Sequence, residues 1–288
     1  MLMRLRRTVV LYYGKFPSGV SLEYHAKFLS LSKPQGEDVF EFLIVTEDQI
    51  GVTSKITGEF ALHNVDILTI DGANDPTTGQ FVLSLFCDLS KANCTAKSIT
   101  DAIREFPFVT KVDYVTAKGR LFDSFHFPLR IMNKHRALII RADPLLEVEK
   151  HLVEVLGSAG DTVMFVEGKT YASKTWMHLK NALPNASHEE LLQNVMDGLR
   201  ATGWGLFEFR SEQNLFHVSI RNPPKLENLK TSQSLFVRGI AVGTVESLYG
   251  VKVTVRDASY DDKSDTVQLT LENSTHPLQV HQTSQILT

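Results

Sequence analysis

The most informative polar cluster in the sequence is Glu-Asp-Gln-Ile-Gly-Val at residues 47–52. It follows a run typical of a β-strand and precedes apolar residues at helical spacing, which predicts a tight strand-to-helix turn. The first backbone N–H groups of such a helix are unpaired and bind carboxylates and other small anions. Gly51 lets a ligand or a neighbouring chain approach the backbone closely. A plain structural turn is the alternative, because a single glycine is weak evidence for a site.

A second candidate site is formed by aromatic residues in the C-terminal half of the chain. Trp176, His178 and Trp204 are predicted to line a pocket for a hydrophobic or aromatic ligand. Such sites are usually apolar cavities with a few polar groups. The alternative is an ordinary core that contains two tryptophans and a hydrogen-bonded histidine, because large aromatic side chains mostly fill cores.

The motifs of several common chemistries are missing. The ten histidines form no H-E-x-x-H motif, and Cys87 and Cys94 are not a credible metal pair. We therefore expect no metal site and no cofactor. The sequence has no G-x-S-x-G, P-loop or dinucleotide-binding glycine pattern, so we predict that the protein is not an enzyme.

Composition narrows the function classes further. A length of 288 residues predicts two domains, and 43% hydrophobic with 22% charged residues is typical of a folded soluble chain. The net charge of −3 argues against a dedicated nucleic-acid binder, which usually carries a basic excess. No apolar stretch is long enough to span a membrane. Two cysteines indicate reduced thiols, so we expect a cytoplasmic protein with no membrane or direct nucleic-acid partner.

The first half of the chain is predicted to contain an extension at 1–37 and a domain at 38–117. A strand at 8–13 and an amphipathic stretch at 22–31 fall in the extension. The domain shows the order βαββαβ, a ferredoxin-like layout with both helices on one face of an antiparallel sheet. We expect Phe42, Val82 and Phe86 on the other face. The predicted elements are strand 40–46, helix 52–61, strand 65–70, strand 80–89, a helix from Asn93 or Thr95 to 105, and strand 109–115.

The second half is predicted to be a mixed α/β domain at 137–273, which gives an α+β protein overall. Residues 118–136 contain three phenylalanines and are predicted to be a connection docked on a domain, and 274–288 a flexible tail. Glycines at 239 and 243 indicate close packing of a buried helix. The predicted elements are strand 137–141, a helix after Asp143-Pro144 ending at Gly157 and burying Leu145, Val148, Leu152 and Leu156, strand 161–166, helix 169–180, a helix after the capping box Ser187–Glu190, a hairpin of 205–210 with 215–221, a buried helix 235–249, and strands 251–256 and 266–271.

Residues 40–117 resemble an ACT domain, the amino-acid-sensing module of many metabolic enzymes. Asp48-Gln49-Ile50-Gly51-Val52 and His63-Asn64-Val65-Asp66-Ile67 are similar to the family's D-x-P-G-V/L and G-x-N-I elements. Gln49-Ile50 stands where the family often has Arg-Pro, and His63 where a glycine is common. The resemblance implies a ligand between the turn of one copy and the second strand of another, bound by Asp48, Gln49, Ile50, Gly51, Val52, Asn64 and Val65.

Residues 125–272 resemble the V4R (4-vinyl reductase-like) small-molecule-binding domain. The similar segments are Phe125–Leu129 leading into Arg136–Ile140, Phe165-Val166-Glu167-Gly168, and the glycine-bearing run Phe236–Gly243. The family often ends in a metal-binding hairpin that contains cysteine. Residues 251–272 contain none, so we expect that metal site to be absent.

These observations predict a small-molecule-sensing regulatory homodimer that binds an amino acid or similar small anion. Its output is expected to pass through a partner protein. Three alternatives stay open. The protein could be a regulatory subunit of a biosynthetic enzyme, an enzyme that uses the V4R-like pocket, or a structural adaptor with a tethering-type fold, since the V4R domain is related in fold to vesicle-tethering subunits.

Overall fold

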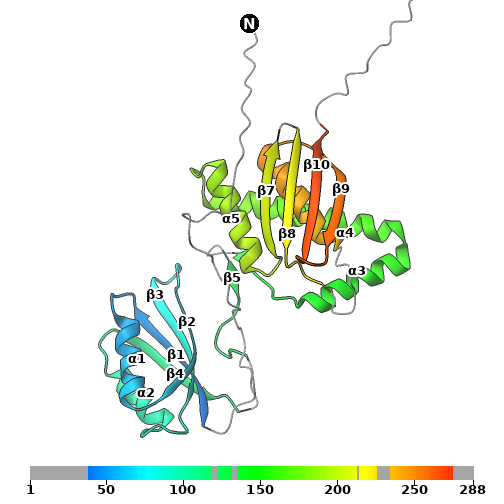
Figure 1. The fold of residues 1–288 in the computed structure, drawn as a ribbon. Helices are drawn as coiled ribbons and strands as arrows, with labels where there is room; N and C mark the ends of the chain where they lie inside the picture. Colours follow the sequence, from blue (N-terminus) through cyan, green and yellow to red (C-terminus); the bar gives the residue numbers. More distant parts are fainter. Residues whose placement is uncertain (1–37, 119–121, 132–134, 213, 226–233, 275–288) are drawn as a thin grey trace, which may run out of the picture. The chain divides into compact units, whose positions relative to one another are not determined.

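A computed structural model of the chain describes residues 38–118, 122–131, 135–212, 214–225 and 234–274. These residues fall into two compact units, 38–138 and 139–274. The strand predicted at 8–13, the stretch at 22–31 and the tail at 275–288 lie outside the described residues. The protein is mixed α and β, with antiparallel sheets in both units (Figure 1).

The first unit has the predicted order of strands and helices. Its four-stranded sheet has the order β2-β3-β1-β4 with antiparallel neighbours, and both helices cover one face (Figure 1). Two short strands follow and pair with each other. The elements are β1 (Val39–Glu47), α1 (Val52–Leu62), β2 (Asp66–Asn74), β3 (Gln80–Asp88), α2 (Ala96–Arg104), β4 (Val109–Thr116), β5 (Arg130–Ile131) and β6 (His135–Arg136).

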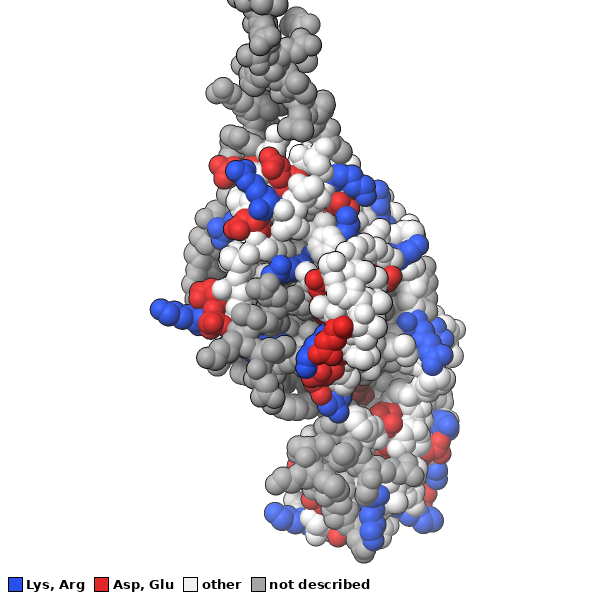
Figure 2. Space-filling model, turned by 90° about the vertical axis from the view of Figure 1, so that its right-hand side faces the viewer, with Lys and Arg blue, Asp and Glu red and all other residues white. Residues whose placement is uncertain are grey.

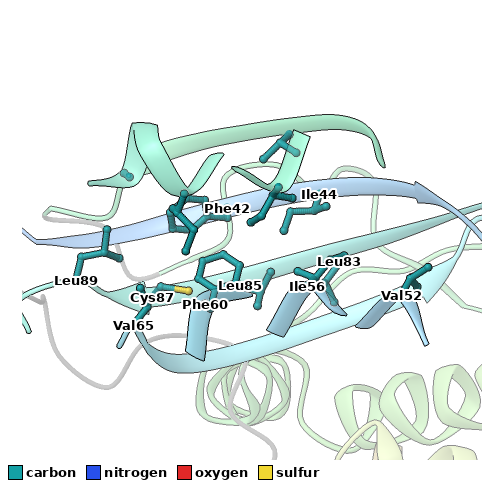
Figure 3. Packing of buried hydrophobic residues seen from close by; sticks show 14 of the residues in the cluster. Phe42, Ile44, Val52, Ile56, Phe60, Val65, Leu83, Leu85, Cys87 and Leu89 are labelled. Atoms are coloured by element: carbon teal, nitrogen blue, oxygen red, sulfur yellow. The ribbon is translucent and has the colours of Figure 1, made fainter. Parts of the chain in front are cut away.

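The core of the first unit lies between the sheet and its helices. Phe60 of α1 meets the ring of Phe42 edge-on at 5.2 Å between centroids, and Ile44 and Leu85 are fully buried beside them (Figure 3). The prediction that Phe42 faces away from the helices is therefore wrong. Side chains alternate along a strand, so Phe42 shares the face of Phe40 and Ile44, whereas Glu41 and Leu43 face the other way.

The second unit places helices against a second antiparallel sheet of order β7-β8-β10-β9. Alternate residues of these strands, such as Phe209, Val218 and Leu269, are buried on one face. Helices α4 and α6 lie on one side of this sheet (Figure 1). The elements are α3 (Ala142–Leu156), α4 (Ser158–Ala182), α5 (His188–Ala201), β7 (Leu206–Glu212), β8 (Leu215–Arg221), α6 (Leu235–Tyr249), β9 (Val253–Asp261) and β10 (Thr266–Asn273).

Two predicted strands of the second unit are wrong. Residues 137–141 are irregular, and residues 161–166 belong to α4. A short apolar run fits a strand or a buried helix equally well by sequence pattern. Here the buried side of α4 shows a repeat of four residues, formed by Gly160, Met164, Gly168 and Ala172. Packing of this side against neighbouring helices therefore favours a helix over a strand.

Helix α3 buries only part of the predicted face, because Leu145 and Leu152 are half-buried. Val148 and Leu156, predicted to be buried, are 54% and 48% exposed, whereas Leu146 and Glu149 are buried. The carboxylate of Glu149 lies at the start of α6, where it accepts hydrogen bonds from the Ser234 hydroxyl (2.8 Å) and the Leu235 N–H. A carboxylate at a helix N-terminus satisfies unpaired N–H groups and interacts favourably with the helix dipole, which accounts for its burial.

Helices α4 and α6 approach until their backbones touch. A Cβ atom on Gly239 or Gly168 would overlap a main-chain carbonyl of the facing helix, that of Phe165 or Phe236 respectively. A Cβ on Gly243 would lie 2.7 Å from the carbonyl oxygen of Lys169. The predicted close packing of this glycine-bearing helix is confirmed, because only glycine permits such an approach.

We expect Gly239→Ala to lower the free energy of unfolding of the second unit by about 1–3 kcal/mol or more. The added Cβ would meet backbone atoms, which cannot move aside as the end of a side chain can. Chemical denaturation monitored by circular dichroism measures the change. Gly198→Ala in α5 is the matched control, because its Cβ would meet no atom within 4 Å. The control should be stabilised by roughly 0.5–1 kcal/mol. Equal unfolding midpoints for the two variants would contradict the packing argument.

Candidate functional site

The turn between β1 and α1 is exposed along its length. Gly51 precedes α1 in the left-handed conformation, with φ of 87°. No side chain caps the helix there, and the side chain of Ile50 is entirely exposed. Within the described residues, the N–H groups of Thr53 and Ser54 have no acceptor. The turn therefore presents backbone donors to solvent, as the sequence pattern predicts.

The polar side chains of the turn are held by neighbouring strand residues. Asp48 Oδ2 accepts a hydrogen bond of 2.9 Å from Asn74 Nδ2 at the end of β2. Gln49 Nε2 donates to Glu47 Oε2 at 2.7 Å. Neither side chain makes a capping hydrogen bond to the start of α1, so its backbone donors are accessible as far as the described residues are concerned.

The second half of the predicted ligand site lies at the far end of α1. Asn64 has a φ of 54° and donates from Nδ2 to the carbonyl of Lys91 at 2.8 Å. Val65 is buried, and its N–H donates to the carbonyl of Phe60. Helix α1 has 11 residues, so it separates Val52 from Asn64 by about 16 Å. One copy of the unit does not bring the two halves together.

A buried carboxylate that the sequence reasoning missed lies on the sheet face opposite the helices. Glu41 is fully buried, and both of its oxygens accept the N–H of Ser124, at 3.0 and 3.1 Å. Ser84, also buried, donates to Asp123 Oδ2 at 3.0 Å. The segment around residues 123–126 thus lies on this face of the sheet. The alternation of β1 makes Glu41 look like a solvent-facing residue. Residues 118–136 were predicted to dock on a domain, but the sequence did not indicate that they cover this face of the sheet.

The two carboxyl groups of this cluster have opposite pKa shifts. Burial raises the pKa of Glu41 above its ordinary value; hydrogen bonds from Ser124 oppose the rise, and the charge of Asp123 adds to it. Burial alone would also raise the pKa of Asp123. Hydrogen bonds from the N–H and ring of His126 and from the N–H of Phe125 outweigh burial and hold that pKa below its usual range.

The aromatic residues of the second predicted site fall into two environments. The ring of Trp204 packs against Phe236 and Tyr171, with centroids 5.2 and 5.7 Å apart. Trp176 is buried on the side of α4 that carries Ala172 and Leu179. His178 is half-buried on another side of the same helix. Tyr171 and Phe236 were missed as companions of Trp204, because they lie on helices far apart in sequence.

Two cavities of the second unit are lined by other residues. One, of about 620 Å³, lies between α4, the C-terminal half of α6 and residues 250–252. The other, of about 210 Å³, lies on the exposed face of the sheet beside Glu208, His217 and Gln268. The polar side chains that line this smaller cavity contact one another across the sheet. For example, Gln268 Nε2 donates a hydrogen bond of 3.1 Å to Ser219 Oγ.

In the part of the chain that the structure describes, no cluster of three or more histidine, cysteine or acidic residues is arranged to hold a metal ion. Among the same residues, no helix has both the length and the hydropathy needed to cross a membrane.

Comparisons with known proteins give partial likenesses. No protein-family model matches the sequence, and no curated protein matches it. The ACT domain of GTP pyrophosphokinase from Chlorobium tepidum is 25% identical, with a TM-score of 0.23 over 27% of this chain and 96% of that one. The phenol-responsive sensory domain of the transcription activator PoxR is 12% identical, with a TM-score of 0.41 over 49% of this chain and 78% of that one.

A formyltetrahydrofolate deformylase from Pseudomonas syringae is 20% identical, with a TM-score of 0.25 over 28% of each chain. The structural neighbours thus include ACT domains at low coverage, and none of these three is described as a V4R domain.

The buried Glu41 predicts a pH-dependent stability. Because the folded-state pKa lies above the ordinary value of 4.5, the folded chain keeps this proton where the unfolded chain has lost it. The contribution of Glu41 to stability is therefore greatest below pH 4.5 and declines as the pH rises through the folded-state pKa. We expect Glu41→Gln to gain stability relative to the parent protein as the pH rises from 4 to 7.5.

Urea denaturation across this pH range measures the difference. Exposed Glu105→Gln controls for the loss of one negative charge. A Glu41→Gln difference that stays constant with pH would show that the hydrogen bonds of Ser124 fully compensate the buried charge.

Proposed function

We propose that the protein is a non-catalytic regulatory sensor of an amino acid or similar small anion. In this proposal the first unit is a ferredoxin-like ACT domain, and the second is a V4R-like domain whose pocket involves Trp176, His178 and Trp204. The observation that carries the proposal is the exposed β1–α1 turn. There a left-handed Gly51 precedes a helix in which the N–H groups of Thr53 and Ser54 lack acceptors within the described residues.

The chemistry of the turn suits a zwitterion. The carboxylate of an amino acid accepts hydrogen bonds from the backbone donors at the start of α1, and the helix dipole favours its negative charge. Its ammonium group needs an acceptor, and the exposed carboxylate of Asp48 is positioned in the same turn. Gly51 leaves space beside the backbone, since a Cβ there would meet nothing within 4 Å.

Two observations support the participation of a second copy. Asn64 and Val65 lie about 16 Å from the turn in the same unit, so they complete a site only when another copy contributes them. Strand β2 is at the edge of its sheet, where unpaired backbone groups favour pairing with another chain. Ile70, on this strand, is 48% exposed, and Leu62, the last residue of α1, is 76% exposed. A ligand that fits one dimer arrangement better would shift the population toward it.

The charge distribution supports a protein partner for the output over direct binding to nucleic acid. Basic and acidic side chains are interspersed on the face shown in Figure 2, without a continuous basic patch. Neutralising several phosphates requires a cluster of lysine and arginine residues. A cytoplasmic location stays part of the proposal.

Isothermal titration against the twenty amino acids tests ligand binding at the turn. We expect one or a few to bind and Asp48→Ala to weaken that binding by roughly tenfold or more, because one hydrogen bond to a charged group is lost. Asp113→Ala, which removes an aspartate in the middle of β4, should leave the affinity unchanged. Silence across the panel, or equal losses in both variants, would contradict the proposal.

A second candidate, a structural adaptor, is favoured by the apolar side chains exposed on α3 and α4. Val148, Val155, Leu156, Val163 and Val166 are each at least 43% exposed. Exposed apolar patches on a soluble domain commonly mark an interface. If this surface makes the main contact between copies, the protein acts through assembly and needs no ligand at the turn.

Sedimentation velocity with two matched charge substitutions separates the candidates. For the sensor, we expect a dimer that Ile70→Glu converts to monomer and that Val155→Glu leaves intact, because the charge would be buried at the β2 edge. The converse result would place the dimer contact on α3 and favour the adaptor. A parent protein that sediments as a monomer even with ligand would contradict the sensor mechanism.

A further inference from the structure

We propose that the cavity between α4 and α6 binds an organic anion, with a carboxylate or phosphate head and an apolar body. This site is separate from the β1–α1 turn and does not depend on the pairing of two copies. Its volume of about 620 Å³ falls within the range of small-molecule sites, which is roughly 300–1,000 Å³.

The shape of the cavity follows from two glycines of the second unit. Gly243 keeps the backbone of α6 against α4 at one end of the cavity. Helix α6 ends at Gly250, whose φ of 66° turns the chain so that residues 250–252 form a further wall. Both ends of the cavity are thus set by backbone geometry.

The lining carries an excess of positive charge. Lys169, Lys174 and Lys252 line the cavity together with a single carboxylate, that of Glu246. Lys169 Nζ lies 3.0 Å from Glu246 Oε1, and Lys252 Nζ lies 3.3 Å from Oε2. Lys174 has no ion-pair partner among the described residues. One carboxylate cannot neutralise three ammonium groups, so the cavity attracts a further negative charge.

Glu246 already accepts three hydrogen bonds from protein donors, two of them from lysine ammonium groups. Its Oε1 also accepts the N–H of Val253, at 3.3 Å. Burial alone would raise the pKa of Glu246, but the hydrogen bonds from Lys169, Val253 and Lys252 together with the charge of Lys169 hold it below its usual range. The carboxylate therefore stays ionised and is occupied. A ligand ammonium group would have to compete with Lys169 and Lys252 for this carboxylate, which disfavours amino acids and favours simple anions.

Apolar groups in the same cavity provide a surface for the rest of the ligand. The ring of Phe165 lies 5.9 Å below the ammonium of Lys169, and Val166, nearly half exposed, adjoins it on α4. Val251 lies on the wall formed after Gly250. An anionic head at the lysines therefore places a short apolar chain or ring against these side chains.

A matched set of six-carbon probes tests this site on the full chain: hexanoate, hexyl phosphate and 1-hexanol. Isothermal titration at fixed ionic strength is expected to show binding of one or both anions and at least about tenfold weaker binding of the alcohol, because the alcohol lacks the charge-assisted contacts. Comparison of the two anions identifies which head group the lysines prefer. Anions that bind no tighter than 1-hexanol would overturn the proposal.

Substitution of Lys174 locates the binding. We expect Lys174→Gln to lower the affinity for the anion by about tenfold. The substitution removes the cation that has no ion-pair partner among the described residues, and it leaves the Lys169–Glu246 pair in place. Lys180→Gln, on the last turn of the same helix and outside the cavity, is the control and should bind as the parent does. Circular dichroism checks that both variants are folded.

Equal losses in Lys174→Gln and Lys180→Gln would mean that the attraction is non-specific, and no loss in Lys174→Gln would place the binding elsewhere. Asp48→Ala should leave hexanoate binding unchanged, so failure of the turn site and failure of this site are distinguished.

Discussion

Backbone contact between α4 and α6 is the constraint on which the second unit depends. Two helices approach this closely only where side chains are missing from both, and Gly168, Gly239 and Gly243 supply the gaps. The contact sets the position of α6 on the sheet and one end of the lysine-lined cavity. The first unit is built on another principle, in which larger side chains such as Phe42 and Phe60 interlock between sheet and helices. Close main-chain approach therefore positions two helices of the second unit, whereas larger side chains position a helix on the sheet of the first.

The elements with chemical signals at their ends were predictable from the sequence. The capping box at Ser187 and the glycines at 157 and 250 mark helix ends, because each places a specific backbone or side-chain group where a helix must begin or stop. The helix at 235–249 has the predicted bounds. By contrast, residues 161–166 were wrongly predicted to be a strand, because β-branched apolar residues are common in strands. They are helical because α4 packs against neighbouring helices.

The candidate sites also divide into one that the sequence predicted and others that it did not. The exposed turn at Gly51 was predictable, since one short segment contains the strand end, the glycine and the helix start. Glu41 and the cavity were not, because their neighbours lie far along the chain: Ser124 is 83 residues from Glu41, and Glu246 is 77 residues from Lys169. Local periodicity carries no information on such distant contacts. Val148 and Leu156 were assigned to the wrong face because α3 has apolar residues on more than one side.

The carboxylate of Glu149 at the start of α6 has a mechanical consequence. It belongs to α3, yet it satisfies donors of Ser234 and Leu235 that α6 cannot satisfy itself. Separating the two helices would break both hydrogen bonds, each worth about 1.5–3 kcal/mol because one partner is charged. These hydrogen bonds couple the position of α3 to that of the first turn of α6. The C-terminal half of the same helix lines the cavity, so α3 and the cavity are connected through the two ends of α6.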